Sequence, residues 1–151
     1  MLAGCGVRFD DGGRSAFRAM AEKASAGSLD SIADVAMRRL FPPDMASRMP
    51  DIVAERRRSF LATNVAVFRS ACEALANLDM SNEARELQIP LLASVGEFDE
   101  APPPIMAQDI ARIVPRGTFR VIENCAHVPT LQAPGEVGRL LEEFAKQCSS
   151  L

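Results

Sequence analysis

The stretch IPLLASV, from Ile89 to Val95, decides the fold of this chain. It is a short apolar run with a proline near its start, which is typical of a β-strand buried on both faces of a parallel sheet. Helical spacing of apolar residues follows between 106 and 114, and a second β-rich run lies at 118–122. A strand, a helix and a strand with short connections predict parallel βαβ packing.

The residues before this stretch have a different rhythm. Met1–Val7 is an apolar run that we interpret as the end of one further strand. From residue 10 to residue 80 the pattern is helical. One predicted helix carries the apolar positions 17–24. A second carries those from 32 to 40 and is capped by Ser28 or Asp30, and two more lie at about 50–62 and 64–78. We therefore expect a strand end at 1–9, a helical block at 10–80 and an α/β segment with a βαβα pattern at 81–151.

Composition excludes several classes of function. The chain has 151 residues, of which 48% are hydrophobic and 25% charged, enough for one core. A net charge of -3 argues against nucleic acid or an anionic membrane as a partner, and no apolar run approaches the roughly 18 residues of a membrane helix. Four widely spaced cysteines and one histidine predict no metal site, and we expect no cofactor. We interpret the protein as soluble and cytoplasmic.

Two polar residues follow the two predicted strands of the α/β segment. Asp99 comes shortly after the first strand, and His127, 28 positions later, comes shortly after the second. Parallel neighbours end at the same sheet edge, about 4.7–4.9 Å apart, so these side chains can form a hydrogen bond. An acid that orients an imidazole is what the general base of a nucleophile requires. Glu97 and Glu100 flank Asp99 and are the alternative acids.

Both loops carry a motif that resembles a known family. GEFD at 96–99 and NCAH at 124–127 are similar to the acid loop and histidine loop in the C-terminal part of the α/β-hydrolase superfamily. The closest resemblance is to 3-oxoadipate enol-lactonases and related small esterases. It implies that Asp99 is the acid and His127 the base of a catalytic triad. It also implies that the helical block from Arg14 to Leu78 is a lid inserted after a core strand.

The sequence also departs from that family. Its nucleophile motif G-x-S-x-G does not occur in the chain. Cys5, between Gly4 and Gly6, is the one substitute, although its glycines are adjacent rather than two residues away. The lid has no Trp where the lactonase branch commonly carries one, and Gln132 stands where a Glu is frequent.

Two functional interpretations remain open. In the first, the chain is the lid and acid/base part of a hydrolase that acts on a small-molecule ester or lactone, and is inactive alone because the nucleophile segment is absent. Its apolar sheet edge then predicts self-association or pairing with an N-terminal hydrolase segment. Dehalogenase or carbon–carbon hydrolase chemistry is a variant of this reading. In the second, the chain is a truncated or split interaction module that keeps Asp99 and His127 without catalysis.

Overall fold

The computed structural model describes residues 1–24 and 28–149. The chain forms two compact units. The first, here called the sheet unit, combines Met1–Val7 with Met80–Leu151; the second, the helical unit, is Arg8–Asp79. Among the described residues, no helix is both long and apolar enough to cross a membrane.

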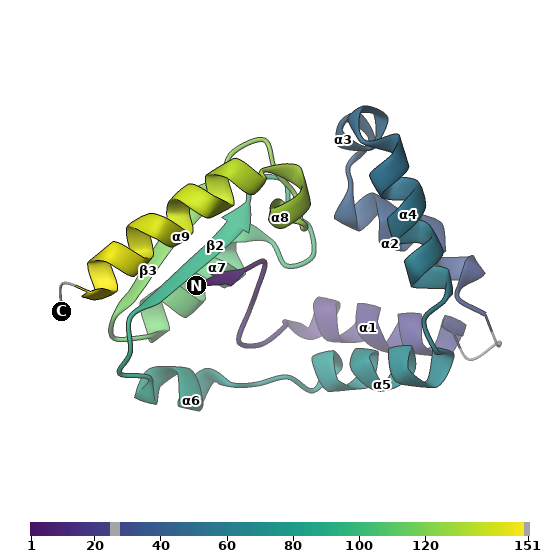
Figure 1. Ribbon diagram of the computed structural model, residues 1–151. Helices are drawn as coiled ribbons and strands as arrows, with labels where there is room; N and C mark the ends of the chain where they lie inside the picture. The colour runs from purple at the N-terminus through teal and green to yellow at the C-terminus, as the bar shows by residue number, and fades with distance from the viewer. Residues whose placement is uncertain (25–27, 150–151) are drawn as a thin grey trace. The chain divides into compact units, whose positions relative to one another are not determined.

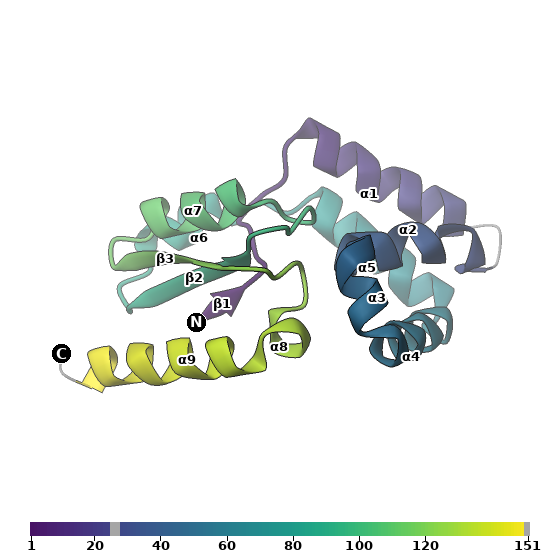
Figure 2. The same cartoon turned by 90° about the horizontal axis from the view of Figure 1, so that it is seen from above.

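The sheet unit is a three-layer arrangement. Its described residues form a parallel sheet of three strands in the order β1-β2-β3. Helices cover both faces, with α6 and α7 on one side and α9 on the other (Figures 1 and 2). The elements are β1 (Leu2–Ala3), α6 (Ser81–Glu86), β2 (Leu91–Gly96), α7 (Pro104–Ile113), β3 (Gly117–Ile122), α8 (Pro129–Gln132) and α9 (Pro134–Ser149). The predicted α/β class and parallel sheet are confirmed.

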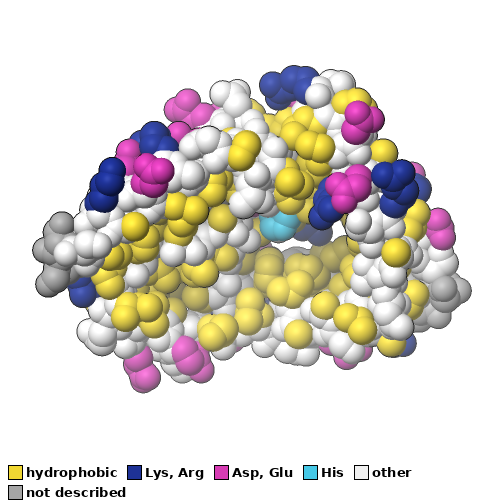
Figure 3. Space-filling view, viewed as in Figure 1, with side chains coloured by type: hydrophobic (Ala, Val, Ile, Leu, Met, Phe, Trp, Pro, Cys, Tyr) yellow, Lys and Arg dark blue, Asp and Glu magenta, His cyan; other side chains and the backbone are white. Residues whose placement is uncertain are grey.

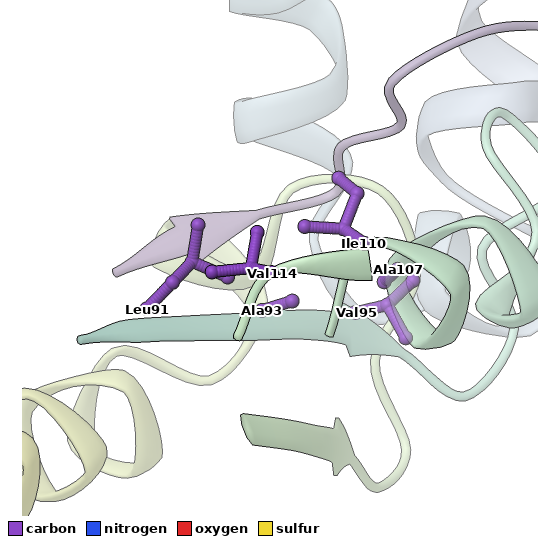
Figure 4. Close-up of a cluster of buried hydrophobic side chains, with 6 residues drawn as sticks. All are labelled: Leu91, Ala93, Val95, Ala107, Ile110 and Val114. Carbon is purple, nitrogen blue, oxygen red and sulfur yellow. The ribbon is translucent and has the colours of Figure 1, made fainter. Parts of the chain in front are cut away.

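β2 is the centre of the sheet, and all six of its residues are buried. Side chains alternate between the two faces of a strand, so one set packs toward α7 and the other toward α9. Figure 4 draws the first cluster, which consists of Leu91, Ala93, Val95, Ala107, Ile110 and Val114. Leu92 lies in the second cluster with Ile122 and Leu140. Full burial of each large aliphatic side chain contributes about 1.5–3 kcal/mol, which makes β2 a rigid base for the loop that follows it.

β1 is much shorter than the sequence analysis expects. Instead of a strand over Met1–Val7, only Leu2 and Ala3 are in strand conformation. Gly4 has φ of 59°, a left-handed conformation that ends an extended segment, although its N–H still donates to the Ser94 carbonyl at 2.9 Å. β1 is an edge strand and Leu2 is 43% exposed. Hydrophobic side chains come to the surface of this unit in Figure 3.

The helical unit contains the predicted helices and one short helix that was not predicted. Its described helices are α1 (Asp11–Ala24), α2 (Asp30–Leu40), α3 (Pro43–Arg48), α4 (Pro50–Leu61) and α5 (Val65–Ala76). α1 and α5 lie side by side (Figure 1). The core brings Ile32 against Phe60 and Phe68, whose rings meet edge to face at 5.5 Å between centroids. Asn64 begins α5 by accepting hydrogen bonds from the N–H groups of Ala66 and Val67.

Some details of the predicted helix faces are wrong. Val35 and Leu75, both placed on apolar faces by their spacing, are 43% and 37% exposed. In α2 Ile32 is buried as expected, but Ala33 and Met37 are buried beside it, and Ala36 and Leu40 are only partly buried. Successive residues lie about 100° apart around a helix, so a buried face centred between Ile32 and Met37 leaves Val35 outside its edge.

Candidate active site

The structure brings together the two residues that the sequence predicts as acid and base. β2 and β3 end in register, with Gly96 opposite Ile122, so the two following loops leave the sheet side by side. Here they are called the acid loop (97–101) and the histidine loop (123–128). Nδ1 of His127 lies 3.1 Å from Oδ1 and 3.0 Å from Oδ2 of Asp99. The contact is within hydrogen-bond distance, and neither Glu97 nor Glu100 takes this place.

Burial differs sharply between the two partners. Asp99 is only 2% exposed, and its Oδ1 also accepts a hydrogen bond from the Ala101 N–H at 2.8 Å. The His127 side chain is 27% exposed and reaches the surface, where it is coloured cyan in Figure 3. An ionised carboxylate only accepts hydrogen bonds, so the proton of a neutral imidazole facing it belongs on Nδ1. Nε2 then carries the free electron pair that a general base needs.

Gly4 lies close to both members of the Asp99–His127 pair. A Cβ at Gly4 would lie 3.3 Å from Oδ2 of Asp99 and 3.4 Å from Nδ1 of His127. The left-handed φ of Gly4 and this close approach both favour glycine. From the sequence Gly4 is only a neighbour of Cys5, because the pattern alone does not indicate which residue the acid and the base will approach.

Backbone contacts hold the two loops against each other. A Cβ at Gly96 would lie only 2.2 Å from the carbonyl oxygen of Ala126, so the histidine loop passes directly over the end of β2. The Phe98 N–H donates to the Cys125 carbonyl at 2.8 Å. The carboxylate of Glu97 accepts the Asn124 N–H at 3.0 Å. Glu97 therefore links the loops rather than serving as the acid.

Cys5 has the surroundings of a packing residue. It is partly buried and lies against the cluster between β2 and α7. Burial raises the pKa of its thiol, although the nearby N-terminal ammonium group acts in the opposite direction. The thiolate is the nucleophilic form, and a raised pKa reduces its population at neutral pH. This environment does not favour Cys5 as the nucleophile.

Metal-binding groups are not gathered at this edge of the sheet. Over residues 1–24 and 28–149, no three His, Cys, Asp or Glu side chains form a group that could hold a metal ion. Cys125, next to the pair, is fully buried, and its burial raises the pKa of the thiol to about 11. Its thiol is therefore protonated at neutral pH and is not an anionic ligand.

Comparison with known proteins bears on the fold. No family model matches the chain. The 3-oxoadipate enol-lactonase 2 of Acinetobacter baylyi is 25% identical over 136 residues, which are 90% of this chain and 51% of that protein. The solved enol-lactonase of Burkholderia xenovorans LB400 superposes with a TM-score of 0.86 at 23% identity, over 95% of this chain and 54% of the other. A thermophilic esterase from Thermogutta terrifontis gives 0.84 at 23%, over 97% and 55%.

The parallel sheet, its flanking helices and these superpositions give the chain the fold of the α/β-hydrolases over the part that it covers. The expected resemblance to that superfamily is thereby confirmed. The chain is similar to enol-lactonases and to an esterase. It spans about half the length of these three proteins.

Proposed function

We propose that this chain supplies the acid and the base of a hydrolase that cleaves a small-molecule ester or lactone. The observation that carries the proposal is the contact between buried Asp99 and partly exposed His127 at the carboxyl edge of a parallel sheet. The similarity of the chain to an enol-lactonase and an esterase supports the substrate class. In this proposal Asp99 and His127 are members of a catalytic triad.

The chemistry assigned to this chain is proton transfer. Nε2 of His127 takes the proton of a serine hydroxyl as the serine oxygen bonds to the ester carbonyl carbon. The imidazolium, stabilised by Asp99, then returns the proton to the departing alkoxide as the carbon–oxygen bond breaks. A water molecule then attacks the acyl carbon while His127 takes its proton. His127 returns this proton to the serine oxygen as the bond between serine and the acyl group breaks. The serine belongs to a G-x-S-x-G segment, which the 151 residues do not contain.

Two further features belong to the proposal. The helical unit, residues 8–79, is assigned the role of a lid that helps to select the substrate. The exposed edge of β1 is assigned the role of pairing with the strands of an N-terminal hydrolase segment, or with a second copy of the chain. The four cysteines are free, as is usual in a reducing compartment, which supports a cytoplasmic location.

The experiment measures hydrolysis of short-chain p-nitrophenyl esters and simple lactones. The protein is expressed from its native coding region, including the sequence upstream of Met1, together with any protein that co-purifies. We expect hydrolysis that His127→Ala abolishes. Hydrolysis that survives in this variant would contradict the role of His127. A natively expressed protein with no hydrolytic activity would favour the non-catalytic interaction module instead.

A further inference from the structure

The histidine loop also receives contacts from the side chain of Gln132, outside the acid loop. α8 begins two residues after His127 and ends at Gln132, whose side chain turns back to the loop. Its Oε1 accepts a hydrogen bond from the Ala126 N–H at 2.8 Å. The same oxygen lies 3.3 Å from Sγ of Cys125, within range of a thiol hydrogen bond. The raised pKa of Cys125 keeps the thiol protonated and able to donate.

Both of these donors are buried. Cys125 and Ala126 are 0% exposed, so water cannot replace Gln132 as the acceptor without a rearrangement of the loop. An N–H that is buried without a partner is costly, and native structures rarely leave one unpaired. The Gln132 amide therefore fixes the backbone of Ala126, the residue directly before His127.

The acid loop provides a second set of contacts to the histidine loop. The Glu97 carboxylate accepts from the Asn124 N–H, and the Phe98 N–H donates to the Cys125 carbonyl. Three consecutive residues, 124–126, are thus held by contacts from two segments before the chain reaches His127. The Gln132 contacts come from outside the acid loop.

We propose that Gln132 is a positioning residue that orients His127 toward Asp99 by holding the Ala126 N–H. This proposal rests on the proposed function, because orientation matters only if His127 acts as a base. The role is reached through the backbone, so Gln132 itself does not touch the substrate.

The test uses NMR of the full chain, in which His127 is the only histidine and gives a single set of ring signals. In the wild-type chain the neutral ring is expected in one tautomer, with the proton on Nδ1 protected from exchange by Asp99. Gln132→Met has similar length but no acceptor. We expect it to expose the Nδ1 proton to exchange and to produce a mixture of tautomers. Gln132→Glu, which restores an acceptor, should recover the wild-type tautomer.

Gln147→Met is the matched control, because Gln147 is exposed on α9. It should leave the ring signals unchanged. If Gln132→Met does not fold, as judged by circular dichroism, Gln132→Asn tests the same prediction. It keeps the amide group but shortens the side chain by one methylene, so the acceptor no longer reaches the Ala126 N–H. In the natively expressed enzyme, the folded variant should lower kcat by roughly tenfold to a hundredfold at unchanged KM.

Two failures are distinguishable. A wild-type ring without a proton on Nδ1 would contradict the Asp99–His127 pair and with it the proposed function. If folded Gln132→Met or Gln132→Asn shows the same His127 tautomer and Nδ1 protection as the wild type, only the role of Gln132 is overturned. Loss of the Nδ1 signal in the Gln147→Met control would also overturn it, because the effect would then not be specific to the loop.

Discussion

Replacement of Gly96 by Ala tests how closely the histidine loop passes over β2. The new Cβ would lie 2.2 Å from the Ala126 oxygen, 2.5 Å from the Cys125 oxygen and 2.7 Å from the Cys125 carbonyl carbon. Real Cβ atoms essentially never approach closer than 3.0 Å, so the loop must retreat by at least about 0.8 Å. All three contacts are with backbone, which cannot be relieved by a change of rotamer.

The cost follows from these distances. Overpacking of a tight site costs about 1–3 kcal/mol. A retreat of the loop also stretches the 2.8 Å hydrogen bond from the Phe98 N–H to the Cys125 oxygen, which contributes about 1 kcal/mol. We expect Gly96→Ala to lower the free energy of unfolding by about 2–4 kcal/mol. A comparable displacement of His127 would weaken its contact with Asp99.

The assay is urea unfolding followed by far-UV circular dichroism, because the chain has no Trp or Tyr for fluorescence. The His127 ring signals report separately on the sheet unit. Gly138→Ala is the matched control: nothing lies within 4 Å of the added Cβ, and alanine inside α9 should stabilise by about 0.5–1 kcal/mol. A Gly96→Ala variant that is as stable as the wild type, with unchanged ring signals, would refute this reasoning.

The remaining predictions concern a helix start and a buried thiol. Asn64→Ala removes the acceptor for the first N–H groups of α5 and should cost about 1 kcal/mol in urea unfolding, while the His127 signals stay unchanged; an unaltered midpoint would contradict the cap. Burial raises the pKa of Cys125 from 9.0 to about 11, so between these pH values the unfolded thiol loses its proton and the native thiol keeps it. The free energy of unfolding should therefore fall with rising pH, by roughly 2–3 kcal/mol at pH 11, and Cys125→Ala should lack this part of the fall.

Much of the site could be predicted because it depends on local patterns. The apolar run of β2 and the β-rich run of β3 indicate two parallel strands, and strand direction alone brings Asp99 and His127 to one edge. No knowledge of side-chain packing is needed for this step. The loop motifs then supplied the resemblance to α/β-hydrolases.

The positioning contacts could not be predicted, for a physical reason. Gly96 and Gly4 are required by the close approach of segments distant in the sequence, and Gln132 acts through a backbone N–H whose position depends on the path of the loop. Short helices are also missed. α8 has four residues, which is about one turn and too short to develop a helical period.

The proposed pairing of an acid with a base is best tested by Asp99→Asn in the natively expressed enzyme. Asparagine keeps the shape and the acceptor for the Ala101 N–H but removes the negative charge and disfavours the Nδ1 proton of His127. We expect kcat for ester hydrolysis to fall by about 10³–10⁴ with KM nearly unchanged. Asp109→Asn, the same change at an exposed position on α7, should keep wild-type turnover. Near-complete turnover in folded Asp99→Asn would contradict the assignment of Asp99 as the residue that orients the base.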